Sequence, residues 1–191
     1  MALSDSEWIF GDRYRLLWRS DRPPRVADVR NYAENRRGFR STPVVLDDEL
    51  MKKDRMRFIA VSGIRPQETI VVSNEFMDLA VGLREAGIWH EVGHVHFDHA
   101  RRHDFASQEG IRSARVDAIR NGRIVEWEAE ADAFAVARVG PEAFISFLTH
   151  VLDTRPTGAQ TGLNELGRRE LELRIEATRL YPAPRVQGRS R

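Results

Sequence analysis

The pentapeptide His90-Glu91-Val92-Gly93-His94 constrains the fold of this chain more than any other feature. It lies within a helical pattern that runs from Leu83 to His99. Residues four positions apart on an α-helix lie one turn apart on the same face, so His90 and His94 can bind one metal ion together. Glu91 is rotated about a quarter turn from His90, which brings its carboxylate beside the open position of that metal. The segment therefore predicts a helix with two metal ligands and a glutamate that can take a proton from water.

A metal site of this kind needs a third protein ligand, and two sources for it are excluded. The metzincin pattern requires glycine three residues and histidine six residues beyond the second histidine, where this chain has Phe97 and Ala100. The sequence contains no cysteine, which excludes thiolate ligands, cysteine catalysis and disulfides. The best remaining candidates lie on a second helical pattern, from Ile124 to Val139.

Two pairs of acidic residues lie at one-turn spacing on this second helix. In one register Glu128 completes a set of two histidines and one glutamate, and Asp132 accepts the free ring N–H of a ligand histidine. In the competing register Glu126 is paired with Glu130, and the spacing alone leaves both registers open. Two imidazoles and one carboxylate suit zinc better than magnesium or calcium, so we expect one zinc ion per chain.

The combination of His90-Glu91-x-x-His94 with Glu128-x-x-x-Asp132 resembles the gluzincin zinc metallopeptidases. The most similar branch contains the membrane heat-shock protease HtpX of bacteria and the prenyl-protein endopeptidases. Soluble regulatory peptidases of the ImmA type, which share the Glu-x-x-Ala-Asp/Asn-x-Phe-Ala stretch, are the second most similar group. The features shared with the first branch are the strand Thr69-Ile70-Val71-Val72, His99 five residues after His94, the segment from Glu128 to Asp132, Val139-Gly140-Pro141-Glu142 and Glu172-Leu173-Arg174-Ile175.

This resemblance covers about residues 57 to 181 and implies a minigluzincin-like fold with a bound zinc ion. It also implies that Glu128 is the third ligand and that Asp132 supports a ligand histidine, which selects the first register. As a donor to the transition state it favours Arg174, with a structural ion pair as the alternative. His150 is a second candidate donor, although a surface position on an amphipathic helix is the commoner case for such a histidine.

Strand patterns precede helical patterns along the chain, which indicates an α+β fold with a small N-terminal sheet packed on a helical bundle. Aromatic and β-branched runs predict a strand pair within residues 8–18 and further strands over 43–46, 57–61 and 69–72. Apolar periodicity predicts helices over 26–36, 83–99, 111–120, 124–139, 141–153 and 163–180. We divide the chain into an N-terminal segment of unknown role (1–56), a zinc peptidase domain (57–181) and a disordered tail (182–191).

The charge balance and the apolar runs limit the partners of this protein. Thirty basic residues against 29 acidic ones give a net charge of +1, which argues against a general nucleic-acid binder and against a polybasic membrane-surface protein. No uncharged apolar run approaches the roughly 18 residues that a membrane span needs, and the N-terminus lacks a signal-peptide pattern. We therefore expect a cytoplasmic protein that acts on a peptide or protein.

Three hypotheses concern the surroundings of the metal ligands. An extended substrate is expected to pair with an exposed edge formed by Ile70, Val71 and Val72, just before the first ligand helix. Gly93 is expected to let another helix approach. The histidines at the end of that helix are expected to be solvated rather than to form a second metal site; they are His96, His99 and His103.

These observations together predict a zinc-dependent endopeptidase. His90, His94 and Glu128 would hold the metal, and Glu91 would act first as general base and then as general acid. The alternative is a binding or regulatory protein that keeps the zinc ion on the same scaffold and cleaves nothing.

Overall fold

The computed structural model describes residues 8–10, 14–17, 40–46, 48–53, 59–62, 69–103, 108–154 and 161–180. Its strands are β1 (Trp8–Phe10), β2 (Tyr14–Leu17), β3 (Arg40–Leu46), β4 (Ile59–Ser62) and β5 (Thr69–Val72). Its helices are α2 (Asp48–Lys53), α3 (Asn74–Met77), α4 (Val81–His96), α5 (His99–Arg102), α6 (Gln108–Arg120), α7 (Glu126–Val139), α8 (Pro141–Asp153) and α9 (Thr161–Arg179). A small sheet followed by a larger helical part agrees with the expected α+β class.

The five described strands form one sheet in the order β1-β2-β3-β5-β4. β1 and β2 are antiparallel, as expected for the predicted strand pair, and β3 runs parallel to both β2 and β5. β4 pairs with β5 in antiparallel fashion. The N-terminal segment before residue 57 therefore contributes three strands to the same sheet as β4 and β5.

The position of β5 contradicts the expected substrate edge. β3 pairs along one side of β5, from Val44↔Ile70 to Leu46↔Val72, and β4 pairs along the other side, from Ile59↔Val72 to Ser62↔Thr69. Ile70, Val71 and Val72 are also buried. A continuous β-branched run is typical of a strand covered on both faces, whereas a half-exposed strand alternates with polar residues. The prediction that these three residues bind a peptide is therefore wrong.

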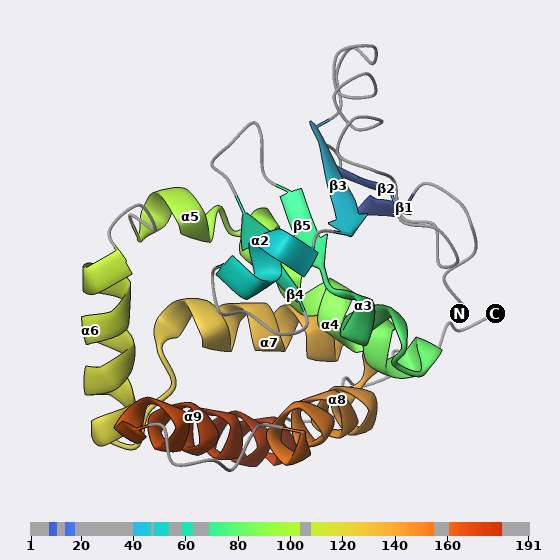
Figure 1. The fold of residues 1–191 in the computed structure, drawn as a ribbon. Helices are drawn as coiled ribbons and strands as arrows, with labels where there is room; N and C mark the ends of the chain where they lie inside the picture. Colours follow the sequence, from blue (N-terminus) through green and yellow to red (C-terminus); the bar gives the residue numbers. More distant parts are fainter. Residues whose placement is uncertain are drawn as a thin grey trace, which may run out of the picture.

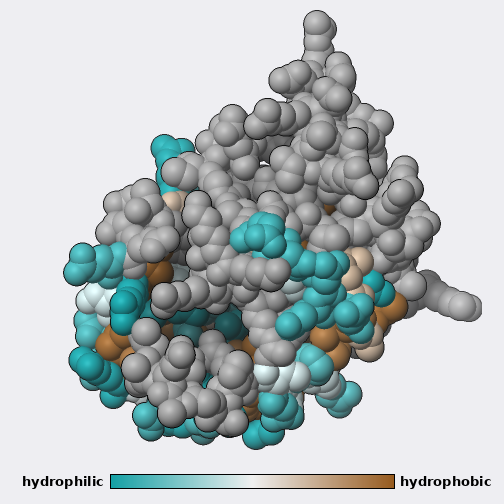
Figure 2. Space-filling view, viewed as in Figure 1, coloured by the Kyte–Doolittle hydropathy of each residue, from teal (hydrophilic) through white to brown (hydrophobic). Residues whose placement is uncertain are grey.

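Helix α4 is the centre of the helical part. It contacts β4 and β5 as well as α7 and α8, and α8 packs against α9 (Figure 1). Ile88 and Val92 of α4 are fully buried in a core that includes Val136 of α7 and Phe144 of α8. Figure 2 shows a mainly hydrophilic surface over the described helices, with a hollow beside α6 that has hydrophilic residues at its floor.

The end of α4 differs from the prediction, which continued the helix to His99. The helix stops at His96, and Asp98 adopts a left-handed conformation with φ 59° and ψ 40°. Aspartate tolerates this conformation better than most residues because its short side chain can bond locally. The short helix α5 then begins at His99, whose exposure is 0%. The expectation of a solvated His99 is therefore wrong, whereas His96 is exposed.

The remaining helices follow their predicted ranges closely. Pro141 occupies the first turn of α8, as expected from its fixed φ, after Gly140 with φ +85° ends α7. α7 begins at Glu126 rather than Ile124, because Val125 is extended. The short helices α2 and α3 were not predicted. The predicted helix 26–36 and the predicted disordered tail 182–191 lie outside the described residues. Among the described helices, none has the length and apolar character that crossing a bilayer requires.

Candidate metal centre

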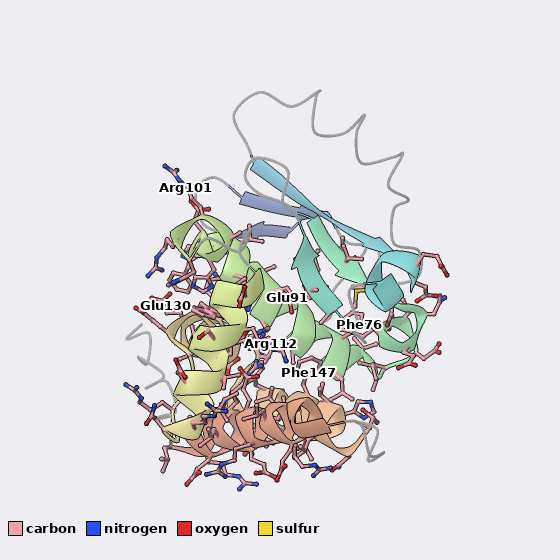
Figure 3. The ribbon with its side chains drawn as sticks, turned by 60° about the vertical axis from the view of Figure 1, so that its left-hand side comes forward. Phe76, Glu91, Arg101, Arg112, Glu130 and Phe147 are labelled. Atoms are coloured by element: carbon pink, nitrogen blue, oxygen red, sulfur yellow. The ribbon has the colours of Figure 1, made fainter. Side chains whose placement is uncertain are left out.

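Helix α4 carries His90, Glu91 and His94 into the interior of the protein. These residues are only 5, 7 and 8% exposed. The Nε2 atoms of His90 and His94 lie 3.1 Å apart, because one helical turn separates the two residues. Figure 3 shows Glu91 between the sheet and the helices. Polar side chains at this depth need polar partners, and α7 and α9 supply them to the histidines.

Helix α7 packs unusually close to α4 at Gly93. An ideal Cβ placed on Gly93 would lie 2.9 Å from the Cα of Ala131 and 3.2 Å from its carbonyl oxygen. Such contacts are too short for any residue with a Cβ, so glycine permits this separation. The expectation that Gly93 admits another helix is confirmed. Because Ala131 lies between Glu128 and Asp132, the same contact brings both carboxylates towards α4.

Glu128 completes a group of three metal-binding side chains. Its Oε2 lies 3.4 Å from Nε2 of His90, and its Oε1 lies 3.9 Å from Nε2 of His94. One ligand atom from each of His90, His94 and Glu128 lies within 4.8 Å of the others, and all three residues are buried. Within the described part of the chain, this is the one group of three such side chains close enough to hold a metal ion.

This donor set fits a zinc ion. Ligand atoms bound at about 2.0–2.1 Å in a tetrahedral site lie roughly 3.3 Å from one another. The separations between the three donors here are 3.1, 3.4 and 3.9 Å. Two imidazole nitrogens with one carboxylate oxygen also suit zinc better than they suit magnesium or calcium, which prefer oxygen ligands.

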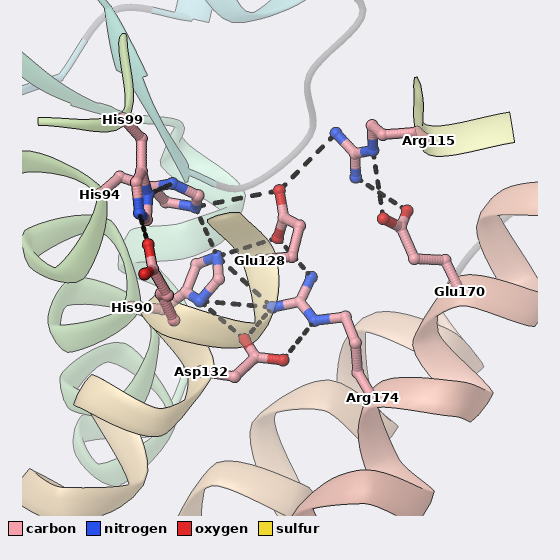
Figure 4. A network of polar contacts seen from close by, with 9 residues as sticks. His90, His94, His99, Arg115, Glu128, Asp132, Glu170 and Arg174 are labelled. Atoms are coloured by element: carbon pink, nitrogen blue, oxygen red, sulfur yellow. Dashed lines mark hydrogen bonds and ion pairs between the residues drawn. The ribbon is translucent and has the colours of Figure 1, made fainter. Parts of the chain in front are cut away.

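A second set of contacts holds the three candidate ligands in place (Figure 4). Oδ1 of Asp132 lies 2.9 Å from Nδ1 of His90. Arg174 of α9 donates from Nε to Oδ2 of Asp132 at 2.8 Å and from Nη2 to Oδ1 at 2.5 Å. Its Nη1 lies 3.1 Å from Oε2 of Glu128. The structural ion pair, which was the alternative role for Arg174, is therefore present. The guanidinium of Arg174 is shared between the carboxylates of Asp132 and Glu128.

The surroundings shift the pKa values of the three candidate ligands in different directions. Burial and the charge of Arg174 lower the pKa of His90, but hydrogen bonds to Asp132 and Glu128 outweigh them and raise it to about 9. Burial holds the pKa of His94 well below its usual value. Burial alone would raise the pKa of Glu128, yet the two neighbouring arginine charges hold it well below its usual value. At neutral pH the metal-free protein therefore has a protonated His90, a neutral His94 and an ionised Glu128.

The other predicted residues lie away from this group. Glu126 and Glu130, the competing register, have side chains that are 70 and 31% exposed, and Glu130 contacts His99 instead. His150 is half-buried in the last turn of α8 and does not belong to the group of metal-binding side chains. His103 is half-buried at the end of α5.

Arg115 is a member of the site that the sequence did not indicate. It lies on α6, and its Nε and Nη2 donate to the two oxygens of Glu170 on α9, at 3.1 and 2.8 Å. Its Nη1 lies 3.8 Å from Oε1 of Glu128. Glu170 is 55 residues away in the chain, and helix α6 has two other arginines, Arg112 and Arg120. No local sequence signal therefore distinguishes Arg115 from its neighbours.

Comparison with known proteins finds no matching family model, no matching curated protein and no matching solved structure. The residues of the site therefore carry the evidence for what this protein does.

Proposed function

We propose that this chain is a zinc-dependent endopeptidase of the gluzincin type. The observation that supports this most is the buried convergence of His90, His94 and Glu128, with Glu91 beside His90 on the same helix. The three grouped side chains would hold the zinc ion. A bound zinc ion would polarise the carbonyl of a peptide bond and make a water molecule more acidic.

Glu91 would carry out the proton transfers. Its carboxylate accepts a proton from the water that attacks the carbonyl carbon. It then gives that proton to the amide nitrogen as the carbon–nitrogen bond breaks. The second proton of the water passes from the new carboxyl group to the amine, so that a carboxylate and a protonated amine leave the site. Because Glu91 is only 7% exposed, bulk water competes little for this proton.

Asp132 and Arg174 would position the ligands. The contact of Asp132 with Nδ1 of His90 leaves Nε2 of that ring directed towards His94 and Glu128. The guanidinium of Arg174 holds Asp132 and Glu128 at the same time. We therefore propose that Arg174 orients the ligands and does not itself bind substrate.

A peptide substrate would pair with β4. This strand pairs with β5 on one side, and no other described strand pairs with it. It also contacts α4, the helix that carries Glu91. A strand edge offers unpaired N–H and C=O groups that an extended peptide can satisfy. Because main-chain pairing is insensitive to side chains, we expect broad selectivity.

The deciding experiment compares the zinc-loaded wild type with Glu91→Gln on a peptide library. An amide cannot accept the proton, so Glu91→Gln should keep its zinc and lose about 10²–10⁴-fold in hydrolysis rate. Glu85→Gln, on the same helix, is the matched control and should cleave at the wild-type rate. An active Glu91→Gln variant would overturn the mechanism. Zinc uptake by a wild type that cleaves no peptide would instead favour the regulatory zinc-binding protein.

A further inference from the structure

A chain of three contacts leads from the second ligand histidine to the surface. Nδ1 of His94 lies 2.8 Å from Nδ1 of His99, and Nε2 of His99 lies 2.7 Å from Oε2 of Glu130. Nη1 of Arg102 donates to the same oxygen of Glu130 at 2.8 Å. Exposure rises along this chain, since His99 is fully buried whereas the side chains of Glu130 and Arg102 are 31 and 42% exposed.

The break after α4 is what places His99 in this chain. If α4 continued through Asp98, His99 would lie further along the helix axis, one residue more than a full turn beyond His94. Instead, the left-handed Asp98 redirects the backbone, and the rings of His94 and His99 meet edge to face at 4.9 Å. The ring of Phe97 stacks on His99 at 5.6 Å and an interplanar angle of 19°. The position of His99 is thus fixed by packing as well as by hydrogen bonds.

A single arrangement of protons satisfies all of these contacts with both rings neutral. His94 must keep a lone pair on Nε2 if that atom is to bind a metal, so its proton lies on Nδ1. Nδ1 of His99 must then accept a hydrogen bond from this N–H, so the proton of the His99 ring lies on Nε2. The Nε2–H of His99 points at Glu130, which as a carboxylate can only accept.

We propose that His99 and Glu130 are positioning residues of the metal centre, which fix the ring and the tautomer of His94 so that Nε2 is free to bind zinc. This inference rests on the proposed zinc site. Helix α7 would then support both ligand histidines of α4, His90 directly through Asp132 and His94 through Glu130 and His99. Partners of this kind raise the basicity of a ligand histidine and hold its orientation.

The test is the zinc affinity of the full chain, measured by competition with a chelator. His99→Leu and Glu130→Ala should each bind zinc about 10–100-fold more weakly than the wild type. His99→Asn should retain part of the affinity, because its amide oxygen can replace Nδ1 as the acceptor from His94. Glu126→Ala is the matched control. The side chain of Glu126 also faces Arg102, at 3.9 Å, but it is not part of the contacts to His99. This variant should bind zinc like the wild type.

A second measurement does not require any variant to fold. In the ¹⁵N spectrum of histidine-labelled, zinc-loaded wild type, His99 should carry its proton on Nε2 and His94 on Nδ1. A His99 protonated on Nδ1 would overturn the proposal, as would wild-type zinc affinity in His99→Leu and Glu130→Ala. A wild type that binds no zinc would instead overturn the proposed function itself, and this inference with it.

Discussion

Arg174 and Asp132 form a buried, two-pronged ion pair that joins α9 to α7. The two hydrogen bonds measure 2.8 and 2.5 Å, and both residues are less than 8% exposed. Asp132 extends the pair to α4 through its contact with His90. Three helices that are far apart in the sequence are therefore tied together at the candidate metal centre.

Removing Asp132 should weaken both the metal site and the fold. Asp132→Ala takes a supporting partner from His90, and we expect zinc affinity to fall about 10–100-fold. It also leaves the buried guanidinium of Arg174 without its main partner, which should destabilise the protein by about 3–5 kcal/mol. Chelator competition and urea unfolding measure the two effects.

The exposed Asp153 on α8 provides the control for this prediction. Asp153→Ala should change neither zinc affinity nor stability beyond about 0.5 kcal/mol. Arg174→Lys keeps the positive charge but cannot make two parallel bonds to Asp132. It should therefore weaken zinc binding, and wild-type affinity in that variant would contradict the positioning role of Arg174.

The metal content of variants tests the ligand assignment. The purified wild type should carry about one zinc ion per chain, because the three side chains would form one mononuclear site. His90→Ala and Glu128→Ala should each lose the metal, whereas Glu126→Ala should retain it. Elemental analysis measures the content directly. Full zinc retention in Glu128→Ala would show that the third ligand lies elsewhere.

The strands and most helix boundaries could be predicted because their signals are local. Pro141 after Gly140 marks the start of α8 within the sequence itself. The end of α4 could not be predicted, because Asp98 is an ordinary helix-compatible residue until the tertiary structure holds it in a left-handed conformation. The role of β5 was missed for a similar reason: the sequence shows a strand but not which strands lie beside it.

The acidic pair that faces the histidines could not be assigned from the sequence for a similar reason. One-turn spacing suits Glu128 with Asp132 and Glu126 with Glu130 equally well, so the sequence alone could not choose between them. The choice depends on which face α7 turns towards α4, and the close contact at Gly93 fixes that face.

The close contact between Gly93 and Ala131 leads to a prediction about stability. Gly93→Ala places a methyl group 2.9 Å from the backbone of Ala131, so α7 must move away from α4. We expect a loss of about 1–3 kcal/mol and weaker zinc binding, because Glu128 moves with α7. Gly82→Ala is the matched control on the same helix. Its new methyl group meets nothing within 4 Å, so it should be neutral or stabilising by up to about 1 kcal/mol. Equal unfolding midpoints for the two variants would show that the close approach is unimportant.

Zinc binding should release a proton from His90. The pKa of His90 is raised to about 9, so the metal-free protein holds this proton at pH 7.5, and a ligand imidazole must give it up. Zinc affinity should therefore rise by about tenfold per pH unit up to about pH 9 from this group alone. The stability of the metal-free protein should change in the opposite direction as the pH rises. Protonated His90 stabilises the metal-free fold fully below about pH 6.5, and this contribution is lost as the pH rises through about 9.

Calorimetry of zinc binding in buffers of different ionisation enthalpy counts the protons released. Comparison of the wild type with Asp132→Asn isolates the contribution of His90, because any proton that a zinc-bound water loses is released by both proteins. Asp132→Asn removes the carboxylate charge and the charged hydrogen-bond partner that raise the pKa of His90, so this pKa falls. Asp132→Asn should therefore release fewer protons than the wild type at pH 7.5. Equal release from the two proteins would show that Asp132 does not control the protonation of His90.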